Sequence, residues 1–286
     1  STTMFSPDTG SAMHRATDSP MHSWHQRGVT LIEMIVVIVV TGILLALVGM
    51  FSRNQITSYF DVAARTELAD AADTALRRIA RELAGALPNS ARVSAGADYI
   101  EFVPIKDGGR YRAAGPGSAF DVTQGGHCFE VFGPTPSAAA GDWLVIYNLG
   151  IPGASSVYAT SAATADSTRK AIDTACPAGQ IGFTGTRFPL ASPQNRFHVV
   201  GGPVSYRCDV ASGVVRRYWG YSFADAQPTP PATGSSSILV DGVTACTFSY
   251  TAGALQRNGL VSMQLTLTKN GESVTLLHQV NVVNTP

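Results

Sequence analysis

The stretch "RGVTLIEMIVVIVVTGILLALVGMF", from Arg27 to Phe51, decides how this chain is built. Between Gly28 and Phe51 it contains one charged residue, Glu33, close to its beginning. Residues 29–52 are long enough to cross a bilayer, because about 20 helical residues at about 1.5 Å each cover a hydrocarbon core of about 30 Å. The sequence therefore predicts a transmembrane helix that carries a carboxylate near one end.

The flanking residues predict which way this helix is oriented. A cleaved secretory signal has an apolar part of only about 7–15 residues and a small-x-small site after it, and residues 49–55 ("GMFSRNQ") contain no such site. His22, His25 and Arg27 precede the run, and no acidic residue follows Asp18 before it. This bias predicts a single pass with a cytoplasmic N-terminus and an exported remainder, which in a bacterium means the inner membrane and the periplasm.

Glu33 has two interpretations when it is considered alone. A carboxylate inside a spanning helix costs on the order of 2.5–3.5 kcal/mol, and such residues are functional by default. Glu33 also lies within one turn of the membrane surface, so its side chain could simply reach the headgroups. Both alternatives stay open until the neighbouring residues are considered.

The segment "RGVTLIEM" (residues 27–34) resembles the processing site of type IV prepilins. In that family a dedicated peptidase cuts after a glycine, and the new N-terminal amine is methylated. The resemblance implies cleavage between Gly28 and Val29, N-methylation of Val29, and a role in assembly for Glu33. Val29 departs from the pattern, because the family usually has Phe or Met at this position. The implied fold is the α+β pilin fold, a long N-terminal helix, transmembrane in its first half, packed on an antiparallel β-sheet domain.

A filament would supply the partner that Glu33 lacks. An unpaired charge in a medium of low dielectric is costly, and the resemblance places a basic amine on Val29 of the neighbouring subunit. We therefore expect Glu33 of one subunit to pair with that amine during assembly. Gly42, Ala46 and Gly49 form a small-residue face that either allows close helix contact or is ordinary for a membrane helix.

The resemblance also divides the chain. Residues 1–28 are the expected leader, and residues 1–20 are either disordered or an extended gene model, since a start at Met21 would leave the short basic leader "MHSWHQRG". Residues 29–52 are the expected transmembrane half of the helix and residues 53–87 its amphipathic half. Residues 88–286 are the expected periplasmic β-rich domain.

The amphipathic half is predicted from residues alone. Asp73 with Arg77 and Arg78 with Glu82 are spaced as i, i+4 ion pairs, and Pro88 ends the pattern. Apolar residues recur every three or four positions and predict one buried stripe, formed by Leu68, Ala72, Leu76, Ile79, Leu83 and Leu87.

Beyond Pro88 the pattern changes to strands. Strands are expected at residues 98–105, 128–133, 142–149, 238–242 and 243–253, and loops at 106–127, 134–141, 150–180 and 226–237. Two hairpins are expected at residues 204–221 and 260–282, and the second turns at Asn270–Gly271, where both residues tolerate positive φ. Its expected cross-strand pairs are Leu267 with Val274, Leu265 with Leu276, and Met263 with His278.

Four cysteines lie in the expected exported region: Cys128, Cys176, Cys208 and Cys246. An even number there favours two disulfides, with three possible connectivities. Sequential pairing closes the shortest loops and is preferred. Free buried thiols and a zinc site are the alternatives, although no C-x-x-C pair occurs and the spacings are long.

Composition argues against a nucleic-acid-binding function. The chain has 286 residues, enough for one or two domains, and 14% of them are charged, against roughly 25% in soluble domains. Twenty basic and twenty acidic residues give no net charge, so no basic excess points to nucleic acid.

No catalytic motif stands out. The sequence lacks H-E-x-x-H, G-x-S-x-G and a P-loop. His198 and His278 lie in strand-like runs and are interpreted as framework residues rather than catalytic bases. Four aromatic residues are interpreted as sheet packing rather than as an exposed ligand patch: Phe197, Tyr218, Trp219 and Tyr221. We expect no enzyme activity, no cofactor and no metal, with a membrane-anchored periplasmic enzyme as the remote alternative.

Segments along the chain sharpen the resemblance. They are "ALRRIARELAGALPNSARV" (75–93), "RCDVASGVVRRYWGY" (207–221), "GLVSMQLTLT" (259–268) and "LLHQVNVVNTP" (276–286). Together they are similar to O-type minor pilins of the mannose-sensitive haemagglutinin (MSHA) pilus and, more broadly, to J-type minor pseudopilins of type II secretion.

This resemblance implies a minor pilin in an initiating or tip complex at the cell surface. The alternatives are a J-type pseudopilin and a tip adhesin. The implied partners are the prepilin peptidase and methyltransferase, other major and minor pilins, the inner-membrane pilus assembly platform and the membrane itself, with no nucleic acid.

Overall fold

The computed structural model describes residues 28–160, 166–253 and 258–286, and it divides into two compact units. The first unit ends at Thr57, and the second runs from Ser58 to Pro286. Helix α1 (Leu31–Ala84) begins in the first unit and ends in the second. The expected leader, with Met21, His22, His25 and Arg27, lies outside the described residues apart from Gly28.

The part of α1 that belongs to the second unit is amphipathic, as predicted. Leu68, Ala72, Leu76, Ile79 and Leu83 are each at most 5% exposed and form one stripe. On the outer face Arg77 Nε donates to Asp73 at 2.6 Å, and Arg78 lies 3.7 Å from Glu82. α1 ends at Ala84, three residues before the predicted end at Leu87. Leu87 is nevertheless buried, because it packs with Val103 and Val145 in a small hydrophobic core. Its N–H donates to Val103 O at 2.8 Å instead of continuing the helix.

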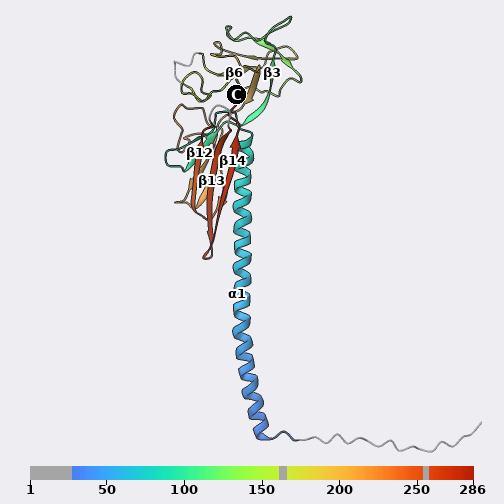
Figure 1. Cartoon of the computed structure of the whole chain (residues 1–286), viewed down its shortest axis with the longest axis vertical. Coiled ribbons are helices and arrows are strands. Elements are labelled where there is room, and N and C mark those ends of the chain that lie inside the picture. The colour runs from blue at the N-terminus through green and yellow to red at the C-terminus, as the bar shows by residue number, and fades with distance from the viewer. Residues whose placement is uncertain (1–27, 161–165, 254–257) are drawn as a thin grey trace, which may run out of the picture. The chain divides into compact units, whose positions relative to one another are not determined.

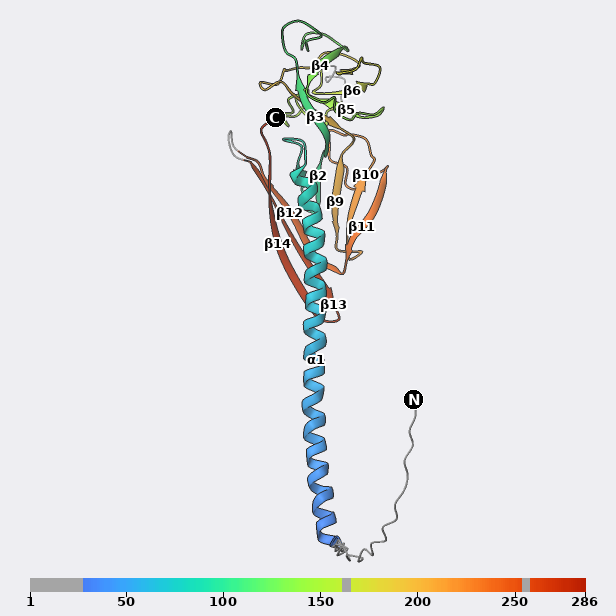
Figure 2. The ribbon, with the colours of Figure 1, turned by 90° about the vertical axis from the view of Figure 1, so that its right-hand side faces the viewer.

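Two antiparallel sheets cover the buried stripe of α1. The larger has the order β1 (Arg92–Val93), β2 (Tyr99–Phe102), β9 (Val204–Asp209), β10 (Val214–Trp219), β11 (Ser235–Asp241). The smaller has the order β12 (Val243–Thr251), β13 (Gly259–Lys269), β14 (Glu272–Val282). Figure 1 shows the smaller sheet beside α1, and Figure 2 shows the strands of the larger sheet from β2 to β11. Side chains from α1 and both sheets share one hydrophobic core.

A six-stranded barrel is inserted between β2 and β9. Its closed order is β3 (Ile105–Tyr111), β4 (Cys128–Phe132), β7 (Gln180–Phe183), β6 (Arg169–Asp173), β5 (Trp143–Val145), β8 (Arg196–Val200). Six aromatic side chains, each at most 5% exposed, fill it: Tyr111, Phe120, Phe129, Phe183, Phe188 and Phe197. Leu87, Val103, Val145 and Val200 belong to a separate small core that joins the barrel to the region just after α1.

The α+β class and both hairpins were predicted correctly. The β13–β14 register pairs Leu267 with Val274, Leu265 with Leu276, and Met263 with His278, as expected. The β9–β10 hairpin likewise pairs Asp209 with Val214 around the predicted turn.

The expectation of one sheet was wrong, because the domain has two sheets and a barrel. The predicted strand 98–105 is interrupted after Phe102, since Pro104 has no N–H for a sheet ladder, and the chain leaves the larger sheet for the barrel there. The expected loops 106–127 and 150–180 contain most of β3 and all of β6, and the expected loop 226–237 contains the start of β11. β3 was not predicted because it contains Gly109, and glycine is generally unfavourable in strands. The structure shows why glycine is present: a Cβ at this position would lie only 3.0 Å from the Phe197 ring.

Candidate functional site

The residues just before α1 are exposed. Gly28, Val29 and Thr30 lie outside the helix and are solvent-exposed, so the bond between Gly28 and Val29 is in an accessible, irregular segment. A Cβ added to Gly28 would meet no atom within 4 Å. Nothing in the described chain therefore requires glycine at this position, and any such requirement must come from a molecule that recognises the segment.

Thr30 positions the first turn of the helix. Its Oγ1 accepts from the Glu33 N–H at 3.3 Å, and its carbonyl accepts from the N–H groups of Glu33 and Met34. These contacts make Thr30 the N-cap, three residues before Glu33, in the spacing of a capping box. Sequence reasoning did not single out Thr30, although the T-x-x-E spacing was visible.

Glu33 lies in the first turn of α1 with its side chain exposed. Among the described residues it has no ion-pair partner. The partial positive charge at a helix N-terminus favours a carboxylate there, typically by 0.3–1 kcal/mol. This is weak compensation for a charge in a bilayer, and it leaves the carboxylate available to a second molecule.

The helix that follows is apolar on every side. Leu31–Ser52 has a mean hydropathy of 3.0 and is long enough to span a membrane. Its large apolar side chains from Leu31 to Phe51 are 48–79% exposed. Gly42 and Gly49 would each accept a Cβ without meeting any atom within 4 Å. In this first unit the whole surface of the helix is available to lipid or to other helices.

Comparison with known families matches residues 25–49 to the prokaryotic N-terminal methylation motif. No curated protein and no solved structure matches the chain. The chain therefore carries the signal of type IV pilins and pseudopilins, followed by an apolar helix that fits the membrane anchor typical of such proteins.

The motif supports a type IV pilin or pseudopilin that is processed by prepilin peptidase and assembles with other pilins. It suggests a structural rather than an enzymatic protein. The match covers only residues 25–49, so it says nothing about the β-rich unit.

The four cysteines form two disulfides with the sequential pairing that was preferred. Cys208 of β9 bonds to Cys246 of β12 and so joins the two sheets. Cys128 of β4 bonds to Cys176, which follows β6.

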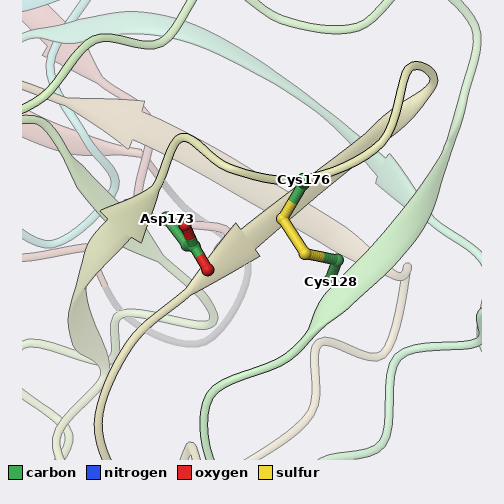
Figure 3. A group of neighbouring side chains, drawn as sticks. All are labelled: Cys128, Asp173 and Cys176. Carbon is green, nitrogen blue, oxygen red and sulfur yellow. A yellow bond between two sulfur atoms is a disulfide. The ribbon is translucent and has the colours of Figure 1, made fainter.

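Figure 3 shows the Asp173 carboxylate beside the Cys128–Cys176 bond, and one oxygen lies within 4.8 Å of both sulfur atoms. Zinc is bound by thiolates. The intact disulfide therefore leaves this group without the sulfur ligands that the zinc alternative requires.

The other residues singled out by sequence have structural roles. Burial, assisted by Arg196, lowers the pKa of His198 to about 4, so this ring is neutral near pH 7. His278 lies half-buried on β14. Phe197 and Tyr221 are buried, while Tyr218 and Trp219 are half-buried, so these four residues do not form an exposed aromatic patch.

The sequence did not predict a buried polar cluster around Glu101. Glu101 is fully buried on β2, where its carboxylate accepts from Arg92 Nε at 2.5 Å and from the Tyr221 hydroxyl at 2.8 Å. Burial raises the pKa of Glu101 above its usual 4.5, and Arg92 opposes that shift. The sequence signal was a single carboxylate in the apolar run "YIEF". Because every partner lies within the chain, we interpret the cluster as structural.

Proposed function

We propose that this chain is a minor pilin of an MSHA-like type IV pilus and that it acts in the initiating or tip complex. Prepilin peptidase would cut between Gly28 and Val29 and methylate the Val29 amine. Residues 29–52 would then anchor the subunit in the inner membrane, with residues 53–87 completing the helix. The β-rich domain of residues 88–286 would face the periplasm and later the cell surface.

The single observation that carries this proposal is the Glu33 carboxylate, which has no ion-pair partner among the described residues, next to the accessible Gly28–Val29 bond. Cleavage would create an amine four residues before Glu33, at the exposed start of the helix. As membrane helices bundle, the amine of a neighbouring subunit would reach the exposed Glu33 carboxylate from outside. In low dielectric such a pair is strongly favoured over two separate charges.

The inserted barrel supports a minor rather than a bulk role. It packs against the region just after α1, through Leu87 and Val103. In a filament whose subunits stack along their helices, a domain at this position would occupy space needed by the next subunit. No such conflict arises at the tip, where no further subunit follows. The inner-membrane assembly platform and the other pilins are the partners that this role requires.

Glu33→Gln tests the charge pairing because it removes the charge and keeps the shape of the side chain, and Thr41→Val is a control substitution at another polar position of the apolar helix. We expect both full-length variants to insert in the membrane and to yield methylated Val29 by N-terminal mass spectrometry. Only Glu33→Gln should lose incorporation into sheared filaments, by about 10-fold or more if the pair is worth at least 1.4 kcal/mol. Normal incorporation of Glu33→Gln, or an intact leader in the wild type, would contradict the proposal.

Deletion of the gene distinguishes the specific role. Loss of an initiating subunit should abolish pili, whereas loss of a tip adhesin should leave pili that fail to attach. A J-type pseudopilin would instead be required for protein secretion. Counting surface pili by electron microscopy and assaying secretion in the same strain separates these three outcomes.

A further inference from the structure

Each of the two sheets ends in a strand with one open edge. β11 is hydrogen-bonded to β10 only, and β14 is hydrogen-bonded to β13 only, within the part of the chain that the structure describes. An open edge presents a row of unpaired N–H and C=O groups, which is a template for another strand. Natural proteins usually protect such an edge with proline, lysine, a bulge or a very short strand.

β14 has none of these protections. It contains 11 residues, Glu272–Val282, and pairs with β13 over its whole length without a bulge. It has no proline, lysine or arginine. Its one acidic residue, Glu272, is at its start and forms an ion pair with Arg65 of α1. The rest of the edge is uncharged, so nothing electrostatic opposes the approach of a strand.

The direction of β14 relative to α1 follows from contacts at its two ends. Glu272 at the start of the strand contacts Arg65, in the earlier part of the second unit's helix. After the strand ends, Asn284 O accepts from Asn89 Nδ2 at 3.1 Å, beyond the end of α1. β14 therefore runs parallel to α1.

β11 runs in the opposite direction. Its last residue, Asp241, lines the same hollow as Glu67 and Leu68 of α1. Its first residue, Ser235, pairs with Trp219 of β10. Two residues before Trp219, Arg217 contacts Glu82 at 3.0 Å, and Glu82 lies farther along α1 than Glu67. β11 is therefore antiparallel to α1, and the two open edges of one molecule run antiparallel to each other.

We infer that β14 of one copy pairs with β11 of a second copy, so that their sheets join edge to edge. This inference rests on the proposed function, which anchors all copies in one membrane with their α1 helices parallel. In that arrangement β14 and β11 of neighbouring copies are antiparallel, as a standard ladder requires. Pairing of β14 with β14 would need antiparallel helices for an antiparallel ladder, so the membrane disfavours it.

The side chains suggest a register for this contact. Leu277 on β14 is 66% exposed and Ile238 on β11 is 55% exposed, and both point away from the shared core. Placing them opposite each other forms an apolar cross-strand pair. β11 has a bulge between Ile238 and Val240, so regular pairing in this register is limited to residues 235–238 of β11, opposite residues 277–280 of β14. The contact uses different surfaces on the two copies, so it is a heterologous interface.

Cysteine cross-linking in isolated membranes tests the pairing in the full-length protein. Ile238→Cys and Leu277→Cys are made as separate variants, expressed alone and together. The four native cysteines are already bonded in pairs. Opposed residues of an antiparallel ladder lie within the Cα range that a disulfide tolerates, so we expect a covalent dimer, about 10-fold above either variant alone, only when both are present.

Each outcome decides the inference. A mixed dimer supports it, whereas no dimer, or a dimer formed by Leu277→Cys alone, overturns it. The N-terminal residue is determined in the same membranes, so a missing dimer with methylated Val29 rejects the edge pairing and keeps the pilin assignment. An unprocessed N-terminus rejects the pilin assignment, and the cross-link then still reports on the edges.

A charge placed on the edge gives a second, independent measurement. Leu277→Lys puts a lysine on the open strand, while Gln264→Lys puts one on the same outer face of β13, directly opposite Leu277. Both positions are exposed, so both variants should fold and keep their two disulfides. Co-precipitation of two differently tagged full-length copies should fall several-fold for Leu277→Lys only, and equal values for the two variants would overturn the inference.

Discussion

Glycines have different roles in the apolar part of α1 and in the barrel. In the apolar part of α1 a Cβ on Gly42 or Gly49 would meet nothing, whereas in the barrel a Cβ on Gly182 would overlap Cys176 Sγ and lie 3.1 Å from Cys128 Sγ. The barrel glycine is required by the chain's own packing. The helix glycines are not required by anything that the described chain contains.

Two glutamates show the same contrast. Glu101 is enclosed with Arg92 and Tyr221, while Glu33 is exposed without an ion partner in the described chain. The β-rich unit therefore supplies the partners of its buried carboxylate, whereas the described chain supplies no ion partner for Glu33. Substitutions in the β-rich unit should change the free energy of unfolding, and substitutions in the N-terminal segment should change assembly.

The largest effect is expected for Arg92→Met. It would leave the Glu101 carboxylate buried without its cation, which typically costs 3–5 kcal/mol. Urea unfolding of the full-length protein in detergent, followed by tryptophan fluorescence, measures the change. A loss below about 1 kcal/mol would show that Tyr221 alone satisfies the carboxylate.

Gly182→Ala should have the next largest effect. The added methyl group would collide with the Cys128–Cys176 disulfide, and overpacking of this kind costs about 1–3 kcal/mol. The matched control is Gly42→Ala, which should leave the unfolding of the β-rich unit unchanged. If Gly182→Ala unfolds like the wild type, the barrel must adapt more easily than its packing indicates.

His198→Gln should change how stability depends on pH. The pKa of His198 falls from 6.5 to about 4 on burial, so between these values the unfolded chain binds a proton that the folded chain does not. Stability should therefore decline as the pH falls through this window, by at most about 3 kcal/mol from this residue. Unfolding midpoints at pH 7 and pH 4.5 should differ less in His198→Gln, and an equal difference in both proteins would contradict the assignment.

The smallest effect is expected for Arg77→Met. Arg77 pairs with Asp73 on the exposed face of α1, and such pairs contribute about 0.3–0.5 kcal/mol. This variant removes the same side chain as Arg92→Met and so isolates the consequence of burial. Equal losses in the free energy of unfolding for Arg77→Met and Arg92→Met, measured by the same urea titration, would show that burial of the ion pair makes no difference.

Local signals predicted the features that short segments determine. The stripe from Leu68 to Leu83 follows from helical periodicity, and the β13–β14 register follows from the Asn270–Gly271 turn, where both residues have positive φ. The N-terminal motif is likewise contiguous, because a peptidase reads a linear segment. The preferred disulfide pairing was also found, although the sequence favoured it only through loop length.

Long-range pairing was beyond the reach of those signals. The barrel closes through β3 with β8 and β5 with β6, and the two strands that were missed, β3 (IKDGGRY) and β6 (RKAID), are short and rich in glycine or charge. Their pattern resembles loops until the partner strand is known. Glu101 was missed for a related reason, since its partner Tyr221 is distant in sequence. Thr30 is different, because its capping spacing was visible but was absorbed into the processing motif.

The insertion point of the barrel has a practical consequence. β2 and β9 are neighbours, with Phe102 opposite Val204, so the chain departs from the larger sheet and rejoins it at the same place. A short hairpin turn could bridge these two residues without moving either strand. The barrel is thus a cassette, which evolution or an engineer can exchange for another module while the scaffold beneath keeps its connectivity.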